Sequence, residues 1–303
     1  MGTNLKSPAH PCLAKGDLAA FLAYRTRTMS HAFLKMNGLG NDFVVVEART
    51  APFSPTAAEV RAIANRQAGI GCDQLISIEP STTADARVRF WNADGEEVGA
   101  CGNGSRCVGW LLMEAAGTDQ VVMETLGGPL QARRVGDRLV SVDMGAPRLA
   151  WKQIPLSEEM DTTGIELQVG PIDAPHLHTP GCVNMGNPHV VFFVSDAETA
   201  PVREAGSMIE HHMLFPEGVN VGFAQIKARD RIRLRVWERG AGLTKACGTG
   251  ACAALVAAAR RNLTDRMATL ELDGGELTIE WRASDDHVIM TGPVEIEFTG
   301  VLP

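Results

Sequence analysis

The sequence lacks several features that mark large classes of protein. It has no apolar stretch close to the roughly 18 residues that a bilayer crossing requires, so we do not expect a membrane-spanning protein. It has no excess of positive charge, because its net charge is −8 at pH 7, and nucleic acid or an anionic membrane is not an expected partner. Its seven cysteines lack the close, regular spacing of a secreted disulfide scaffold, and we expect thiols in the reducing cytoplasm.

The first thirty residues differ from the rest of the chain. Within them, the apolar run Leu18–Tyr24 is too short, and follows too little positive charge, for a secretory signal. We interpret residues 1–30 as a poorly ordered tail, or as upstream sequence from a misplaced start with Met29 or Met36 as the functional beginning, and we expect no role for them. The remaining length is sufficient for two domains, and 45% hydrophobic with 21% charged residues is typical of a globular protein.

The chain repeats itself at a constant offset of 146 residues. Ala100–Gly104 (ACGNG) reappears as Ala246–Gly250 (ACGTG), and Arg87–Trp91 (RVRFW) reappears as Arg233–Trp237 (RLRVW). Self-similarity of this kind indicates two copies of one structural unit.

Each copy also carries a helix with little polar surface, predicted around Cys107–Met113 in the first and Ala251–Ala259 in the second. A helix that is apolar all round must be buried all round. The predicted fold is therefore α+β, with two similar domains that each wrap a curved mixed β-sheet around a buried central helix, and with the active site in the cleft between them. We place the domains at 31–146 and 147–293, and we expect the C-terminal strand 294–303 to complete the first.

Shorter patterns predict the neighbouring elements. Phe33–Val46 is predicted to form two strands joined by a tight turn, because Asn37–Asn41 is dense in turn residues. Ala57–Arg66 has helical spacing. Arg87–Phe90 and its copy Arg233–Val236 alternate polar and apolar residues, as half-buried strands do.

Cys101 and Cys247 occupy equivalent positions, so two facing copies would place two thiols on opposite sides of one cleft. This arrangement suits an enzyme that removes a proton from one face of a carbon atom and returns it to the other. Each cysteine precedes a Gly-x-Gly sequence and a helix start, where free N–H groups and the helix dipole lower a thiol's pKa from about 8.5. The same N–H groups can bind a substrate carboxylate and the negative charge that builds on it when the α-proton leaves.

Other interpretations of the cysteines stay open. The commonest fate of a free thiol is burial without reactivity, which we predict for the five cysteines outside the repeated motif: Cys12, Cys72, Cys107, Cys182 and Cys252. A zinc site would need Cys or His partners at the usual spacing, which the chain lacks, and we predict no metal. A Cys–His nucleophile with His189 would leave the duplicated cysteine unexplained. A thiol-based redox protein is a further alternative.

Five motifs follow one another along the chain: Asn37–Phe43 (NGLGNDF), Asn92–Gly95 (NADG) followed by Cys101–Gly104 (CGNG), Gly186–His189 (GNPH), Glu238–Gly242 (ERGAG) and Ala246–Gly250 (ACGTG). In this order and spacing, from about Phe33 to the C-terminus, they resemble the diaminopimelate epimerase family. The resemblance implies interconversion of LL- and meso-diaminopimelate without pyridoxal phosphate, metal or other cofactor, in the biosynthesis of lysine and cell-wall precursors. It also implies a homodimer.

The resemblance further implies roles for individual residues. Cys101 and Cys247 would be the two acid/base groups, one as thiolate and one as thiol, and His189 and Glu238 would support catalysis. The substrate would be bound by Asn41, Gln74, Asn92, Gly102, Asn103, Asn187, Asn220, Glu238, Arg239, Gly248 and Thr249.

The repeat supports part of this set, because the offset of 146 carries Gln74 onto Asn220 and Asn92 onto Glu238. Arg239 stands out, since a guanidinium suits bidentate capture of the distal carboxylate of the substrate.

Two related families are the nearest rivals. Proline racemases usually carry a histidine after the first Cys-Gly, where this chain has Asn103, and phenazine-biosynthesis isomerases lack the cysteine pair. One departure from the diaminopimelate epimerase pattern is Leu243–Lys245 (LTK), where an acidic residue often precedes the second Cys-Gly. We expect this departure to leave the reaction unchanged.

Overall fold

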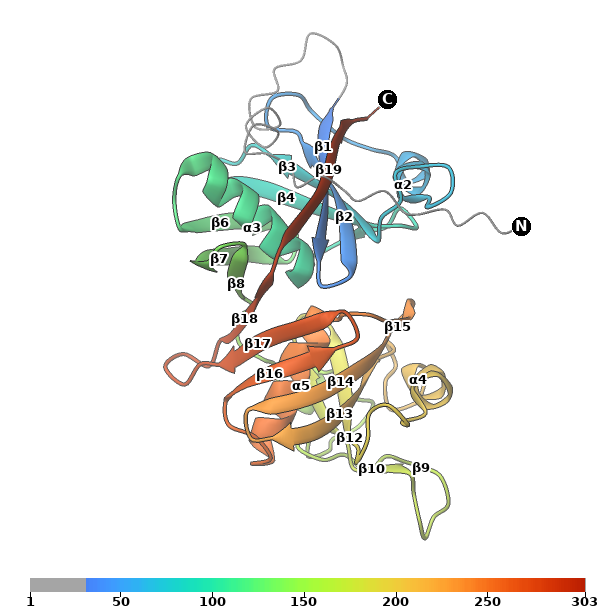
Figure 1. Cartoon of the computed structure of the whole chain (residues 1–303). Coiled ribbons are helices and arrows are strands. Elements are labelled where there is room, and N and C mark those ends of the chain that lie inside the picture. Colours follow the sequence, from blue (N-terminus) through green and yellow to red (C-terminus); the bar gives the residue numbers. More distant parts are fainter. Residues whose placement is uncertain (1–30, 303) are drawn as a thin grey trace, which may run out of the picture.

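The computed structural model describes residues 31–302, so the tail over 1–30 and Cys12 lie outside the described residues. Figure 1 shows two lobes, each with strands around one long helix. This helix is α3 (Gly102–Ala116) in the first lobe and α5 (Gly248–Arg260) in the second. The predicted α+β fold, with two similar units built around buried central helices, is confirmed.

The first lobe contains α2 (Ala57–Ala64) besides α3. Its strands are β1 (Ala32–Gly38), β2 (Asn41–Glu47), β3 (Gln74–Glu79), β4 (Ala86–Asn92), β5 (Glu97–Val98), β6 (Gln120–Thr125), β7 (Gly128–Gly136) and β8 (Leu139–Asp143). The neighbouring pairs β1–β2, β3–β4, β6–β7 and β7–β8 are antiparallel, whereas β2–β3 and β4–β6 are parallel.

The second lobe repeats this arrangement, with α4 (Val202–Glu210) in the place of α2. Its strands are β11 (Gly181–Asn184), β12 (Pro188–Phe193), β13 (Asn220–Ala228), β14 (Arg231–Glu238), β15 (Gly242–Thr244), β16 (Met267–Leu272), β17 (Gly275–Trp281) and β18 (Val288–Pro293). From β11 to β18, parallel and antiparallel pairs follow in the same order as from β1 to β8. The short helix η1 (Trp151–Gln153) and the paired strands β9 (Gln168–Val169) and β10 (Leu177–His178) are additions to the repeat.

Two strand pairings connect the lobes. β8 pairs antiparallel with its structural equivalent β18, so that all described strands except β9 and β10 belong to one sheet. β19 (Glu295–Val301) then runs back along the first lobe and pairs with β1 (Figure 1). Val294, just before β19, is buried in the core of the first lobe. The domain boundaries predicted above stay a prediction, for which an experiment is given in the Discussion.

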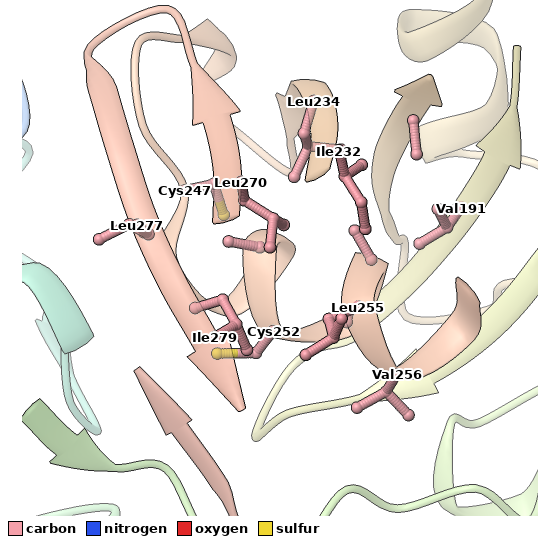
Figure 2. Packing of buried hydrophobic residues seen from close by; sticks show 14 of the residues in the cluster. Val191, Ile232, Leu234, Cys247, Cys252, Leu255, Val256, Leu270, Leu277 and Ile279 are labelled. Carbon is pink, nitrogen blue, oxygen red and sulfur yellow. The ribbon is translucent and has the colours of Figure 1, made fainter. Parts of the chain in front are cut away.

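The central helices are buried along most of their length because most of their side chains are apolar. In α3, the polar residues Asn103, Ser105 and Arg106 are buried as well. Figure 2 shows side chains of α5 and of the surrounding strands directed toward one another, among them Leu255 from the helix and Ile232 and Leu270 from β14 and β16. Four of the cysteines predicted to be inert are at most 1% exposed, which confirms their burial: Cys72, Cys107, Cys182 and Cys252.

The local predictions hold with shifted ends. The β1–β2 hairpin turns through Leu39 and Gly40, both with positive φ. The helix predicted from Ala57 ends at Ala64, because the backbone of Asn65 is extended. At its start, Thr56 forms a capping box with Glu59, which satisfies free N–H groups there.

Candidate active site

Cys101 and Cys247 are the residues at which the two central helices begin. Each has an extended backbone, and its sulfur accepts a hydrogen bond from the N–H three residues later. The sulfur–nitrogen distances are 3.5 Å from Cys101 to Gly104 and 3.4 Å from Cys247 to Gly250. Thr249 Oγ1 lies 3.7 Å from the sulfur of Cys247. The repeated motif therefore places both thiols at the positive end of a helix dipole.

The second glycine of each motif is required by close packing. A Cβ atom on Gly250 would lie 3.1 Å from the sulfur of Cys247 and 3.1 Å from Val236. A Cβ atom on Gly104 would lie 2.8 Å from Ile76. Without side chains at these positions, the helix start can lie against the sheet and leave room for the sulfur.

The two helix starts meet through Asn103. Its amide nitrogen lies 3.5 Å from Asn41 Oδ1 and 3.5 Å from the carbonyl oxygen of Ala246, the residue before Cys247. Asn41 Oδ1 also accepts from the sulfur of Cys101 at 4.0 Å. The structure therefore brings together site residues that are more than a hundred positions apart in the chain.

Met290 of β18 lies between the two helix starts. A Cβ atom on Gly102 would lie 2.6 Å from its Cε atom, and one on Gly248 would lie 2.9 Å from its sulfur. These first glycines of the two motifs thus allow both helices to approach the same side chain.

Glu238 connects the second cysteine to the neighbouring strand. Its carboxylate accepts a hydrogen bond from Thr244 Oγ1 and lies close enough to the Cys247 thiol for each group to influence the pKa of the other. Burial raises the pKa of Glu238, although the hydroxyl of Thr244 and the thiol of Cys247 act in the opposite direction. Thr244 belongs to the segment that departs from the family's usual pattern, and here its hydroxyl orients an acidic residue.

The expected lowering of the thiol pKa values is wrong. Burial raises the pKa of Cys101 to about 11, and it raises that of Cys247 well above its usual value. The hydrogen bonds from Gly104 and Gly250 favour the thiolate, but the loss of hydration outweighs them. The nearby Glu238 also opposes a second negative charge at either sulfur. Both groups are therefore thiols at neutral pH.

A second group of predicted site residues lies along β12 to β14. His189 Nε2 is 2.9 Å from Asn187 Oδ1, and burial lowers the pKa of His189 to about 3, so its ring is neutral. Asn220 donates to the carbonyl oxygen of Pro188 at 2.8 Å and accepts from the backbone N–H of Arg239 at 3.0 Å. Within residues 31–302, no hydrogen bond joins His189 to a cysteine, so this geometry does not support the Cys–His alternative.

The guanidinium of Arg239 is exposed and donates to the carbonyl oxygen of Glu217 at 2.6 Å. Glu210 anchors the turn that contains Arg239. Its carboxylate accepts hydrogen bonds from Gly240 N–H at 2.8 Å and from Trp237 Nε1 at 2.7 Å. The arginine therefore extends from an anchored turn and has no carboxylate partner among the described residues.

In the first lobe, Gln74 and Asn92 face each other on β3 and β4 and are hydrogen-bonded at 2.8 Å. Asn41 donates to Asp73 Oδ2 at 2.7 Å, and Asp73 in turn accepts from Arg66. This network orients the amide of Asn41 beside Cys101.

Sequence reasoning missed four residues that hold the predicted set in place: Asp73, Thr244, Arg106 and Met290. Arg106 gave one usable signal, since the offset of 146 pairs it with Cys252 and so breaks the repeat. Met290 carried a different signal, since the same offset pairs it with Met144. Asp73 and Thr244 are paired with Val219 and Val98, but nothing in the sequence shows that they hydrogen-bond to Asn41 and Glu238.

Residues 31–302 offer neither a metal site of clustered side chains nor a membrane-spanning helix. No group of three or more His, Cys, Asp or Glu side chains is arranged so that it could hold a metal ion. No helix in this part of the chain combines the length and apolar character needed to cross a membrane.

Comparison with known proteins extends the likeness over most of the chain. The family model described as diaminopimelate epimerase matches residues 33–150 and 181–297. A diaminopimelate epimerase of Phenylobacterium zucineum (strain HLK1) is 70% identical over 275 residues, which cover 91% of this chain and 99% of that protein. Another from Caulobacter sp. (strain K31) is 66% identical over 284 residues, which cover 91% of this chain and 98% of that protein.

Solved structures share the fold at low sequence identity. A hydroxyproline epimerase from Agrobacterium vitis is 16% identical with a TM-score of 0.62, and the match covers 92% of this chain and 94% of that one. A phenazine biosynthesis protein of the PhzF family from Enterococcus faecalis is 16% identical with a TM-score of 0.63, over 90% of this chain and 99% of that one. The rival families thus share the architecture only, whereas the family model and the close relatives agree, and the chain belongs to the diaminopimelate epimerase family.

Proposed function

We propose that this chain interconverts LL- and meso-2,6-diaminopimelate, with Cys101 and Cys247 as the two acid/base groups. The proposal rests above all on one observation: two cysteines at equivalent positions of a repeat each begin a buried helix, and Asn103 links the two helix starts. Names of relatives that are 66% and 70% identical support the substrate.

The proposed reaction moves two protons. The thiolate of one cysteine takes the α-proton of the substrate and becomes a thiol. The thiol of the other cysteine gives its proton to the opposite face of the same carbon and becomes a thiolate. In the reverse direction the two groups exchange roles, so neither direction needs an external acid or base.

The N–H groups at the two helix starts would bind the carboxylate next to the reacting carbon, through Gly102, Asn103, Gly248 and Thr249. Negative charge builds on this carboxylate as the proton leaves, and preformed N–H donors stabilise it most in the transition state. Asn41, held by Asp73, would line the same position.

The first thiolate must form from a thiol whose pKa burial has raised. Glu238 lies beside Cys247, and burial raises the pKa of its carboxyl group as well, so this carboxylate is a stronger base than an exposed one. We assign Glu238 the role of accepting the Cys247 proton, so that the pair carries one negative charge in either state.

Gln74 would line the pocket at the reacting carbon together with Asn41. The distal amino-acid end of the substrate would be bound by Arg239 with Asn92, Asn187, Asn220 and Glu238. An exposed guanidinium without a carboxylate partner among residues 31–302 suits a carboxylate that arrives with the ligand. The neutral His189 would orient Asn187 and would not transfer a proton.

NMR of LL-diaminopimelate in D2O tests this function, with reduced enzyme and neither pyridoxal phosphate nor metal added. Deuterium should enter one α-position while the meso isomer accumulates. Exchange with proline but not with diaminopimelate would keep the two-base chemistry and reject the substrate. No exchange with any amino acid would favour a redox role for the thiols.

Cys101→Ala and Cys247→Ala should each abolish epimerisation while the protein stays folded, because one proton donor or acceptor is lost. Cys107→Ala is the matched control, since this buried thiol lies in α3 but outside the proposed reaction. Full turnover by either folded active-site variant would refute the two-base assignment.

Homodimer formation and a cytoplasmic location are also proposed, on the family resemblance and on the free thiols. Light scattering coupled to size-exclusion chromatography tests the first, and fractionation of the source cells tests the second.

A further inference from the structure

Arg106, in the first turn of α3, is a buried cation without a counter-ion. Its side chain is 0% exposed, and within residues 31–302 no carboxylate forms an ion pair with it. One guanidinium nitrogen donates to Asn103 Oδ1 at 2.8 Å and lies 3.5 Å from the sulfur of Met290. Its Nε and its other terminal nitrogen have no hydrogen-bond partner. An unpaired buried charge is costly, so its presence calls for an explanation.

The space around the guanidinium is shaped by glycines from two strands. A Cβ atom on Gly292 of β18 would lie 3.1 Å from the Cζ and Nε atoms of Arg106. A Cβ atom on Gly38 of β1 would lie 3.4 Å from its terminal nitrogen. The cation therefore occupies a fitted position between the strand that begins the first lobe and the strand that joins the lobes.

The two copies of the repeat differ at the position of Arg106. The equivalent residue of the second copy is Cys252, and the two are close enough to interact electrostatically. Arginines at both positions would repel each other. Only the first copy therefore has an arginine where the two central helices approach each other, and the second copy has a cysteine.

We infer that Arg106 is a positioning residue for the proposed reaction. It orients Asn103 between the two helix starts, and its positive charge balances the negative charge of the thiolate and of the bound carboxylate. This inference rests on the proposed function for the identity of that carboxylate. Asn103 accepts from Arg106 through its oxygen, which turns its amide nitrogen toward Asn41 and Ala246. A charge of this kind, already in place before the reaction, needs no reorganisation when negative charge develops.

The charged and titratable groups around the reactive sulfur are few. Glu238 of β14 opposes ionisation of Cys101, and Arg106 favours it. Arg106 in turn faces the thiols of Cys101, Cys107 and Cys252. Arg106 is the one cation among these groups, so its removal should raise the pKa of Cys101.

The test is alkylation of substrate-free enzyme by iodoacetamide at about pH 8, with the Cys101 peptide followed by mass spectrometry. In this reaction the thiolate displaces iodide, so its rate follows the thiolate fraction. Arg106→Met should slow alkylation of Cys101 about tenfold, equivalent to a pKa increase of about one unit. Arg106→Lys should keep most of the rate, because it keeps the charge. Arg203→Met, which removes an exposed arginine of α4, is the matched control.

Epimerisation should fall by about tenfold or more in Arg106→Met and recover largely in Arg106→Lys. A folded Arg106→Met with wild-type alkylation would overturn the inference. So would equal slowing in both variants, since that would assign the effect to packing instead of charge. If Arg106→Met does not fold, Arg106→Lys alone decides, because a tenfold slowing there contradicts the role of the charge. Alkylation needs no substrate, so its result stands apart from failure of the proposed function.

Discussion

At the scale of single residues, opposing effects act on the same sulfur atoms. The N–H groups of Gly104 and Gly250 favour the thiolates of Cys101 and Cys247, while burial favours the thiols and prevails. The consequence is that both cysteines are protonated at neutral pH. A thiol is a weaker nucleophile than a thiolate, so this state also limits side reactions.

His189 shows the same dominance of burial, with a pKa lowered to about 3. The unfolded chain takes up this proton below about pH 6.5, whereas the folded protein does not, so stability present above that pH is lost as the pH falls toward 3. His189 alone should contribute a slope of up to about 1.4 kcal/mol per pH unit to the free energy of unfolding. Urea unfolding of the wild type and His189→Gln between about pH 7 and 4 measures it.

The comparison uses the pH slope, because the substitution also changes stability at every pH. His189→Gln should show a shallower loss of stability on acidification than the wild type. His176→Gln, at an exposed position, should retain the wild-type slope. Parallel curves for the wild type and His189→Gln would contradict the assignment of a neutral buried ring.

At the scale of elements, the start of each central helix is the unit to which we assign the proposed proton transfer. A Cys-Gly-x-Gly sequence provides a helix start, a thiol above it and the space for both, because the glycines lack the atoms that would collide with Val236, Ile76 and Met290. The same unit occurs twice, and contacts through Asn103 make one site of the two copies.

Gly250→Ala should separate activity from stability. The added methyl group would press on the sulfur of Cys247, 3.1 Å from its ideal position, so epimerisation should fall by about tenfold or more. Alanine favours the helix over glycine by about 1 kcal/mol, which offsets much of the crowding in the thermal melt. Steady-state kinetics and thermal unfolding measure the two effects.

Ala259→Gly, near the end of α5, should give the opposite pattern, with stability lowered by about 1 kcal/mol and activity retained. Unchanged turnover in Gly250→Ala would mean that the sulfur position tolerates the methyl group. It would then remove the packing argument for this glycine.

At the scale of the whole molecule, the chain closes on itself. β8 pairs with β18 across the junction of the lobes, and β19 returns to pair with β1. The C-terminal residues therefore contribute to the core of the lobe formed by the N-terminal part of the chain, as Val294 does.

Val294→Asp tests whether the last strand completes the first domain. Val294 is 2% exposed in the first-lobe core, so a carboxylate there should cost several kcal/mol. Hydrogen exchange should speed up in β1, β2 and α3 before it does so in β13 and α5. Thr299→Asp, exposed on β19, is the matched control and should leave the exchange pattern unchanged. Equal loss of protection in both lobes would instead indicate one cooperative unit.

The repeat, the two buried helices and the pair of equivalent cysteines could be predicted from the amino-acid sequence, because residue identity and spacing show them without knowledge of which distant segments meet. The family followed from the order of its motifs. The amino-acid sequence did not determine that Asn103 would link the helix starts, that Thr244 would hold Glu238, or that Arg106 would lie unpaired between the lobes. Nor did it give the protonation of Cys101 and Cys247. Those outcomes depend on which distant segments exclude water from a group, and only the tertiary structure decides how deeply each group is buried and what lies beside it.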